Sequence, residues 1–288
     1  MGVYTMDKQL TEKIKNELVK CGFPLEIYCR KELLKSGFAL GSGQYYFNDE
    51  NKLREIDGEA DIQEEIKYKG DKITLFSIIF IECKKSDKKQ WVFFHDKAWL
   101  SDLNFNTNIK GLEEKINLKL ANEYKNIHYY NFKNVAQNYV IPFCNPNSNE
   151  SRQIYDSLLG LINYAEQHLK EKIHYKGSSP YFELNVLCVI YDGVIIMAEP
   201  TENTFKLKEA KHVIVNFNQR KEFKSYNYSI DIVQRSYFKK YLEIIKQDNN
   251  TIKEYIQKSL QQITPGDGLQ PPLSSSVIPD FNGKSSDQ

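Results

Sequence analysis

The stretch Ile73–Cys83, with the sequence ITLFSIIFIEC, is the most informative segment for the fold. Its apolar residues occupy both strand parities instead of alternating with polar ones, which is typical of a strand covered on both faces. We therefore expect this segment to be a central strand of a β-sheet.

A long helix and further strands follow from the pattern downstream. Apolar residues over Arg152–Ile173 recur every three or four positions, which predicts an amphipathic helix, and Glu183–Tyr191 then predicts a strand. This order favours a right-handed crossover beside the central strand. Asp192 and Gly193 are typical of a two-residue turn, so we expect a hairpin between that strand and Val194–Glu199.

The remaining chain reads as alternating helices and strands. Helices are expected over Lys8–Cys21, Pro24–Ser36, Gly111–Tyr124 and Arg235–Gln261, and strands over Gly41–Phe47, Leu53–Lys67, Lys211–Phe217 and Tyr228–Val233. We predict an α/β fold with a mixed central sheet flanked by helices on both faces. One domain would cover 1–263, with an insertion around 85–150, and a proline- and serine-rich tail over 264–288 would be disordered.

Composition and charge restrict the possible function classes. Hydrophobic residues make up 41% of the 288 residues, which is enough to build a core. The 39 basic and 38 acidic residues give a formal charge of +1, so no general positive field would hold a polyanion. Any contact with nucleic acid must therefore come from a local patch.

Cysteine usage and hydropathy bear on the compartment. The five cysteines are scattered and odd in number, which favours free thiols in a reducing environment. Residues 1–20 carry charges throughout, without the apolar core of a secretion signal, and no apolar run reaches the roughly 20 residues that span a bilayer. We expect a cytoplasmic protein without membrane contact.

Acidic residues gather in Arg54–Asp61, with the sequence REIDGEAD. Alternate positions of this segment are acidic, and in a strand they would share one face. For Glu55, Glu59 and Asp61, the solvated edge of a half-buried strand is the simpler explanation. Asp57 differs because of the segment that would lie next to it.

Glu82 and Lys84 lie on one face at the end of the central strand, within IECKKSDKK at Ile81–Lys89, and Cys83 points the other way. A buried, unpaired carboxylate costs several kcal/mol, so Glu82 needs a cation. Lys84 alone would make a structural ion pair. A divalent cation between the strands would in addition offset the repulsion between carboxylates on neighbouring strands.

Oxygen ligands beside a lysine favour Mg²⁺ or Mn²⁺, whereas the histidines and cysteines lack zinc spacing. A hard cation of this kind lowers the pKa of an attacking water and neutralises charge on a phosphodiester. Lys84 would orient that water or stabilise the developing oxyanion. The pattern therefore predicts phosphodiester hydrolysis.

EID at Glu55–Asp57, followed by IECKK at Ile81–Lys85, resembles the motif of the PD-(D/E)XK nuclease superfamily, which includes restriction endonucleases and many repair and phage-defence nucleases. The resemblance covers roughly residues 23–89 and implies a restriction-endonuclease-like fold. Ile56 stands where the motif has proline.

The resemblance also implies roles for individual residues. Asp57 and Glu82 would bind the metal, together with the carbonyl oxygen of Cys83, and Lys84 would be the catalytic lysine. Glu26, in the expected helix Pro24–Ser36, matches a glutamate that members of the superfamily often add to the site. A glutamate in a first helical turn also stabilises the helix, which leaves its role open.

Several other residues have both a functional and a structural explanation. Lys85, Lys88 and Lys89 could contact the phosphate backbone or form a solvated turn. Tyr129, Tyr130, Phe132 and Tyr139 could stack on bases or cap the core. Gln153 could touch the site or be an ordinary surface residue.

The leading hypothesis is a Mg²⁺- or Mn²⁺-dependent nuclease that acts on DNA, in phage defence or DNA repair. A partner domain or protein, a second subunit of a homo-oligomer or the insertion around 85–150 would supply part of the grip on the substrate, since the net charge is close to zero. The alternative is an inactive domain of the same fold that binds nucleic acid or protein, and a third reading is a purely structural scaffold.

Overall fold

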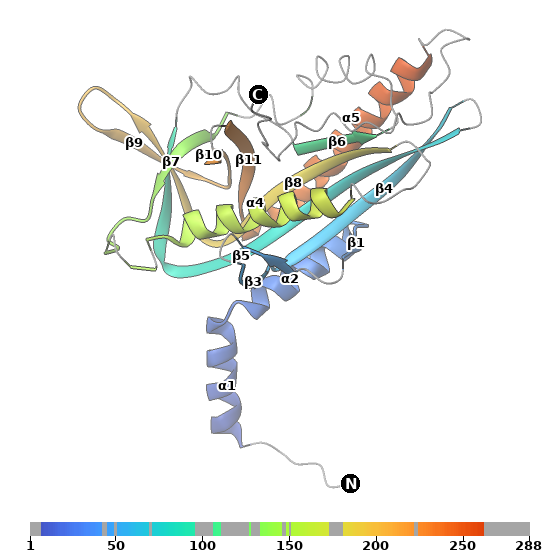
Figure 1. Ribbon diagram of the computed structural model, residues 1–288. Helices are drawn as coiled ribbons and strands as arrows, with labels where there is room; N and C mark the ends of the chain where they lie inside the picture. Colours follow the sequence, from blue (N-terminus) through green and yellow to red (C-terminus); the bar gives the residue numbers. More distant parts are fainter. Residues whose placement is uncertain are drawn as a thin grey trace, which may run out of the picture.

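The computed structural model describes residues 7–41, 45–48, 51–68, 71–95, 106–110, 127, 133–145, 148–149, 151–172, 181–221 and 224–261. β-Strand accounts for 48% of the structure, and the described residues contain four α-helices. Figure 1 shows long strands at the centre of the molecule, with helices laid across them. The predicted helix at 111–124 and the predicted tail at 264–288 lie outside the described residues.

Five strands close into a mixed β-barrel. β5 (Asp71–His95) and β8 (Tyr181–Pro200) run parallel, from the pair Thr74 and Tyr181 to the pair Phe94 and Ala198. β11 (Lys224–Gln234) is parallel to β8, and β10 (His212–Lys221) is antiparallel to β11. β7 (Val135–Val140) then joins β10 back to β5, so the sheet has no open edge along this path.

Further strands extend from the barrel strands. β4 (Gly58–Tyr68) pairs with β5, and the short β1 (Ala39–Leu40) pairs with β4. β6 (Asn106–Lys110) and β9 (Phe205–Ala210) both pair with β8. β2 (Tyr45–Phe47) and β3 (Leu53–Glu55) form a separate two-stranded sheet.

The helices pack on two sides of the long strands. α4 (Gln153–Lys172) packs on β5 and β8, and its amphipathic pattern is the one the sequence predicts. α2 (Phe23–Lys35) and α5 (Phe238–Gln261), which follows the single turn η4 (Arg235–Tyr237), pack together. α1 (Lys8–Lys20) points away from the body of the protein (Figure 1).

Successive residues of β5 contribute to two different cores. Ile78 and Phe80 pack beneath α4 with Leu158, whereas Ile79 and Ile81 pack in the cluster that includes residues of α2 and α5. Each of these side chains is at most 2% exposed, and burying one contributes about 1.5–3 kcal/mol. The prediction that Ile73–Cys83 is a strand covered on both faces is confirmed.

The predicted fold class, a restriction-endonuclease-like central sheet flanked by helices on both faces, is wrong. Five strands form a closed barrel with outer strands attached, and strand prevails over helix. A strand with apolar residues on both faces must be covered on both faces. Layered helices can cover such a strand, and so can closure of the sheet into a barrel, so the two arrangements give the same sequence pattern. The region predicted as an insertion contributes β6 and β7, and β7 closes the barrel.

The predicted hairpin at Asp192 and Gly193 is also wrong, because β8 runs straight through these residues. Four residues of β5, Ser86–Lys89, lie between the paired Lys85–Asp192 and Gln90–Val194, so β5 and not β8 departs from the ladder. This departure is called the β5 bulge below. The predicted helices over residues 8–21, 24–36, 152–173 and 235–261 are confirmed within a few residues.

Candidate active site at the start of β4 and the middle of β5

The predicted strand Leu53–Lys67 is interrupted at Ile56 and Asp57, which separate β3 from β4. Ile56 is fully buried and anchors this break in the core beneath α4. The first residue of β4, Gly58, pairs with Ile81 of β5, so Asp57 arrives beside Glu82 and Cys83. The strand register therefore brings together residues that are 25 positions apart in the sequence.

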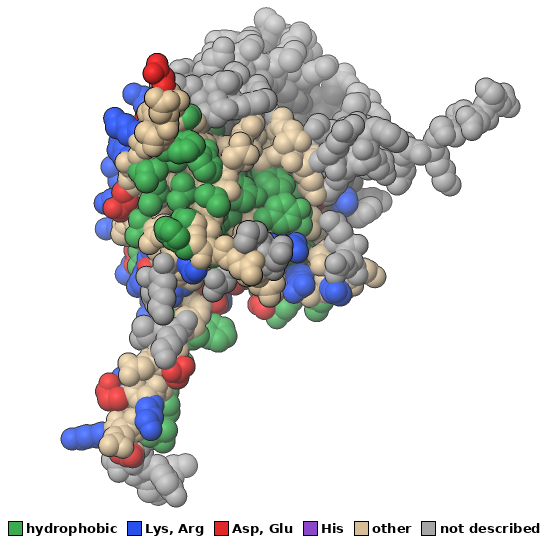
Figure 2. Space-filling model, turned by 90° about the vertical axis from the view of Figure 1, so that its left-hand side faces the viewer, with side chains coloured by type: hydrophobic (Ala, Val, Ile, Leu, Met, Phe, Trp, Pro, Cys, Tyr) green, Lys and Arg blue, Asp and Glu red, His purple; other side chains and the backbone are tan. Residues whose placement is uncertain are grey.

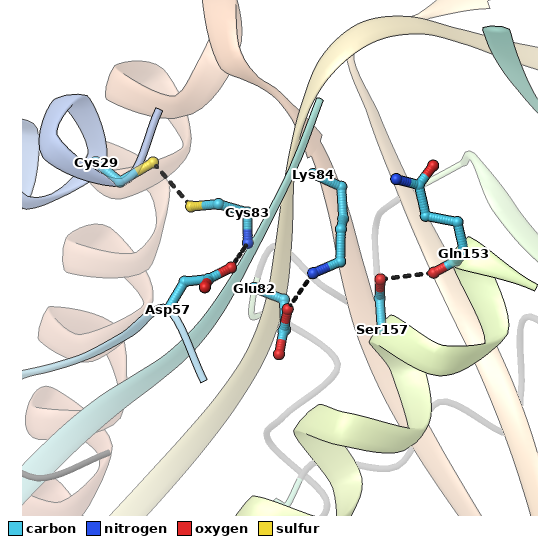
Figure 3. A network of polar contacts seen from close by, with 7 residues as sticks. All are labelled: Cys29, Asp57, Glu82, Cys83, Lys84, Gln153 and Ser157. Carbon is cyan, nitrogen blue, oxygen red and sulfur yellow. Dashed lines mark hydrogen bonds and ion pairs between the residues drawn. The ribbon is translucent and has the colours of Figure 1, made fainter. Parts of the chain in front are cut away.

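Asp57 is held by the main chain of the neighbouring strand. The N–H of Cys83 donates a hydrogen bond to Oδ2 of Asp57 at 2.6 Å (Figure 3). Hydrogen bonds of this kind to a carboxylate are strong and directional, so the Asp57 carboxyl has a fixed orientation. The register of β4 with β5 sets Asp57 beside Glu82, and the charge of Asp57 raises the pKa of Glu82.

Glu82 is an almost completely buried carboxyl paired with Lys84. Nζ of Lys84 donates to Oε2 of Glu82 at 2.5 Å, with side chains that are 27% and 9% exposed. Burial is the main cause that raises the pKa of Glu82 to about 7, and Asp57 acts in the same direction against the lowering effect of Lys84. Glu82 can therefore bind or release a proton near neutral pH.

Lys84 remains a cation in this environment. Burial on its own lowers the pKa of the Lys84 ammonium, but the charges of Glu82 and Asp57 more than compensate and raise the pKa above its ordinary value. The site consequently holds one positive charge beside two carboxyls. Such a group can stabilise a developing negative charge.

Glu26 lies in the first turn of α2, near enough for its charge to interact with those of Asp57 and Lys84. Burial is the main cause that raises the pKa of Glu26, followed by the charges of Asp57 and Glu55. A Cβ on Gly22 would come within 3.2 Å of Oε1 of Glu26, so that oxygen lies against the start of the helix. The structure thus brings Glu26 toward the site.

Cys83 contributes its main chain and directs its thiol toward α2. Its Sγ lies 3.7 Å from Sγ of Cys29, on the side of the strand opposite to Glu82 and Lys84 (Figure 3). The hydrogen bond with Cys29 and burial raise the pKa of the Cys83 thiol well above its ordinary value. A neutral thiol of this kind is a small core side chain, and metal binding through the Cys83 carbonyl stays a prediction.

Two residues beside Glu82 are missed by the sequence reasoning. Tyr46 in β2 is buried, and burial together with the charge of Glu82 raises the pKa of its hydroxyl. Gly160 in α4 lies against both groups, because a Cβ there would be 3.1 Å from the Tyr46 hydroxyl and 3.5 Å from Oε1 of Glu82. A glycine inside a strong helix pattern is a signal that could have indicated this close approach.

The other acidic residues of REIDGEAD have structural explanations. Glu55 is exposed, and Glu59 accepts a hydrogen bond from the hydroxyl of Tyr164 in α4.

Tyr139 packs against Phe93 in the core beneath α4, which fits the prediction of a cap on the core. Gln153 and Ser157 belong to the first turns of α4, in the polar group shown with Glu82 and Lys84 in Figure 3. Tyr129, Tyr130, Phe132 and the side chain of Lys88 lie outside the described residues.

The Asp57–Glu82 carboxyl pair fits a hard divalent cation. Asp57 raises the pKa of Glu82, and a cation between the two carboxyls would offset this unfavourable effect. Among the described residues no group of three or more His, Cys, Asp or Glu side chains is arranged to hold a metal. Mg²⁺ does not require such a group, because it commonly binds through one or two carboxylates and keeps several waters.

Comparison of the chain with family models, with curated proteins and with solved structures returned no match. The assignment of a function therefore depends on the site itself. Within the described residues, no helix is long and apolar enough to cross a membrane.

Proposed function

We propose that this protein hydrolyses phosphodiester bonds of nucleic acid, with DNA as the expected substrate and Mg²⁺ or Mn²⁺ as its cofactor. One observation carries the proposal. The pairing of β4 with β5 sets Asp57 beside Glu82, and Glu82 pairs with Lys84, a partly buried lysine that stays charged. Pairs of carboxyls with a lysine suit the chemistry of phosphoryl groups, which needs charge neutralisation and an oriented water.

Each residue has a distinct part in this proposal. Asp57 and Glu82 would bind the metal, which when bound lowers the pKa of a water and neutralises charge on the phosphate. The N–H of Cys83 fixes Asp57, and Glu82 holds Lys84 at 2.5 Å. Glu82 must release its proton to bind a cation, and a pKa of about 7 allows this near neutral pH. Lys84 would then orient the attacking water or stabilise the oxyanion, and Glu26 would assist from α2.

The setting of this activity belongs to the same proposal. We propose action in the cytoplasm, in DNA repair or phage defence, with a second copy or a partner protein completing the grip on the nucleic acid. A net charge of +1 supports the second copy or partner protein, because the chain has no overall positive charge to hold a long polyanion.

One observation favours a second candidate, a catalytically inactive domain that binds nucleic acid or protein. The ion pair of Glu82 with Lys84 already compensates the buried carboxylate, and no group of three ligands occurs in the described part of the chain. A site of this kind could be structural and would then need no metal.

A cleavage assay distinguishes the two candidates. Chelator-treated full-length protein is incubated with labelled single- and double-stranded DNA and RNA, with and without Mg²⁺ or Mn²⁺. Wild type should cut only with metal, and Asp57→Asn and Lys84→Ala should each lose about 100-fold or more in rate. Glu55→Gln is the matched control, since this exposed acid of the same segment should leave the rate unchanged.

Thermal unfolding gives a second readout that does not depend on cleavage. Mn²⁺ should raise the Tm of wild type and of Glu55→Gln, and should leave the Tm of Asp57→Asn unchanged, because only a protein that binds the ion gains stability from it. Nucleic acid that is bound but left intact under every metal condition would support the binding domain. Absence of both cleavage and any metal effect would refute the catalytic proposal.

A further inference from the structure

A second polar site lies beyond the candidate active site, at the β5 bulge. A cavity of about 400 Å³ opens there between β5, β8, α2 and η4. Its lining includes Ser86, Lys89 and Gln90 from β5, Tyr28 from α2, Gln234 from the end of β11 and Arg235 from η4. Sites for small ligands commonly have volumes of about 300–1,000 Å³, so the cavity suits a ligand of nucleotide size.

The position of the cavity relates it to the active site without merging the two. Ser86 follows Lys84 by two positions on β5, and Tyr28 follows Glu26 by two positions on α2. None of Asp57, Glu82 and Lys84 lines the cavity. The cavity is therefore a neighbouring site with its own side chains.

Arg235 is held firmly within this cavity. Its Nη1 donates to Oδ2 of Asp192 at 2.9 Å, and its guanidinium carbon lies 4.9 Å from the centre of the Tyr28 ring. A guanidinium has five N–H donors, and its fork geometry matches the oxygens of a phosphate. An orientation fixed in this way lowers the entropy lost when an anion binds.

The β5 bulge adds further donors and a second cation. The N–H of Lys89 donates to the Ser86 hydroxyl at 2.9 Å, and the hydroxyl of Tyr191 donates to the Lys89 carbonyl at 2.7 Å, which together fix the shape of the bulge. Among the described residues, the charged side chains of the lining are Lys89, Arg235 and Asp192, and Asp192 is paired with Arg235. The lining therefore favours an anion.

The remaining lining groups suit a planar, polar ring system. Gln90 and Gln234 provide carboxamides, which can donate and accept hydrogen bonds at the edge of a base. Nε2 of Gln234 donates to the carbonyl of Gly193 at 3.1 Å, so this amide is already oriented. Tyr28 provides an aromatic ring that holds the guanidinium of Arg235 at the cavity wall.

We propose that this cavity binds a nucleoside 5′-phosphate, with the phosphate at Lys89 and Arg235 and the base at the carboxamides of Gln90 and Gln234. Two sources share this chemistry, a free mononucleotide and the 5′-phosphorylated end of a nucleic-acid strand. In the second case the cavity would hold a strand end next to the proposed nuclease site, and that part of the inference depends on the proposed function.

Equilibrium binding tests the proposal independently of cleavage. Full-length Asp57→Asn protein in chelator binds a short labelled DNA strand with either a 5′-phosphate or a 5′-hydroxyl, with adenosine 5′-monophosphate or inorganic phosphate as competitor. The phosphorylated strand should bind about ten-fold more tightly than the hydroxyl strand, because the two cations contact the terminal phosphate. If adenosine 5′-monophosphate displaces the labelled strand more strongly than an unlabelled 5′-phosphorylated strand does, the free nucleotide is identified as the ligand.

Two variants locate the binding site. Lys89→Ala and Gln90→Ala should each weaken binding of the phosphorylated ligand, and the matched control Lys239→Ala, an exposed lysine of α5 outside the cavity, should not. Equal binding of the two strands together with no effect of the mononucleotide would overturn the proposal, as would equal losses in Lys89→Ala and Lys239→Ala. Failure of the nuclease proposal would appear in the cleavage and metal-binding assays and not in these binding measurements, so the two failures are separable.

Discussion

At the scale of single residues, the site is defined by a carboxyl that has little access to water. Glu82 is 9% exposed in its side chain and depends on Lys84 for compensation. Breaking a buried ion pair on one side is costly because it leaves an uncompensated charge, whereas replacing both partners can be nearly neutral. The Glu82–Lys84 pair can therefore be tested for a structural contribution separately from its chemistry.

Removing Lys84 alone should destabilise the fold more than removing the whole pair. We expect Lys84→Met to lower the free energy of unfolding by about 2 kcal/mol, less than for a fully buried pair since Lys84 is 27% exposed. The double variant Glu82→Gln, Lys84→Met should recover most of this loss. Urea unfolding of the wild type, both single variants and the double variant measures the coupling, and additive losses would show that the pair contributes no interaction energy.

Tyr191 makes the protein sensitive to alkaline pH. Burial raises the pKa of its hydroxyl to about 12, above the value of 10 expected for an unfolded tyrosine. The folded state keeps the proton longer than the unfolded state, so the stabilisation is complete below pH 10 and is lost as the pH rises toward 12. Tyr191→Phe should reduce the loss of unfolding free energy across this window by about 2 kcal/mol, as measured by urea unfolding at a series of pH values. An equally steep dependence in Tyr191→Phe would assign the effect to other groups.

At the scale of elements, β8 shows how a residue pair typical of a turn can serve another purpose. Gly193 lies within β8 and not in a hairpin turn. Among the described glycines only Gly37 has a positive φ, of 83°, so Gly193 does not adopt a left-handed backbone. The Tyr191 ring folds over Gly193, where a Cβ would come within 2.5 Å of Cζ. The glycine is therefore required for space and not for a left-handed backbone.

Gly193→Ala should disrupt the aromatic packing in the core beneath α4. The Tyr191 ring stacks on Trp91 at 4.1 Å with an angle of 15°, and both side chains are fully buried, so the ring has no room to move away. Overpacking of this kind costs about 1–3 kcal/mol. We expect a lower Tm and a changed near-ultraviolet circular dichroism spectrum. Gly58→Ala is the control, because its Cβ would make an ordinary 3.6 Å contact with Ile81.

At the scale of the whole molecule, the two cores depend on the same strands. β5 and β8 contribute side chains to the cluster beneath α4 and to the cluster that includes residues of α2 and α5. Figure 2 shows one face of the body that these strands build, with α1 extending below it. If either cluster loses its packing, one face of the shared strands becomes exposed, and the same strands can then no longer support the other cluster. The protein should consequently unfold as one unit.

Substitutions in either core should shift the same unfolding transition. Leu33 in α2 and Leu158 in α4 are fully buried in different clusters, and replacing either with alanine should cost about 2–5 kcal/mol. The midpoint in urea should fall equally by far-ultraviolet circular dichroism and by fluorescence of Trp91, measured in a background with the second tryptophan, Trp99, replaced by Phe. A Leu33→Ala shift that is absent from the Trp91 signal would reveal two independent units.

The central strand and the site could be predicted because both depend on short-range patterns. The apolar run Ile73–Cys83 defines a strand covered on two faces, and the hairpin of β4 with β5 sets Asp57 beside Glu82. Barrel closure could not be predicted, because it depends on the pairing of Val135 and Ala136 with Ile214 and Val215, far apart in the chain. Tyr46 reaches Glu82 through a separate small sheet, which no local pattern reports.

The β5 bulge also affects how this chain could vary in length. Ser86–Lys89 lie outside the ladder with β8, while paired residues continue on both sides of them. An extra residue here would change neither flanking alignment, whereas an extra residue inside Ile78–Cys83 would turn every following side chain to the opposite face. The bulge is therefore the place where evolution or an engineer can lengthen this strand, and with it alter what the neighbouring hollow accepts, while the fold stays the same.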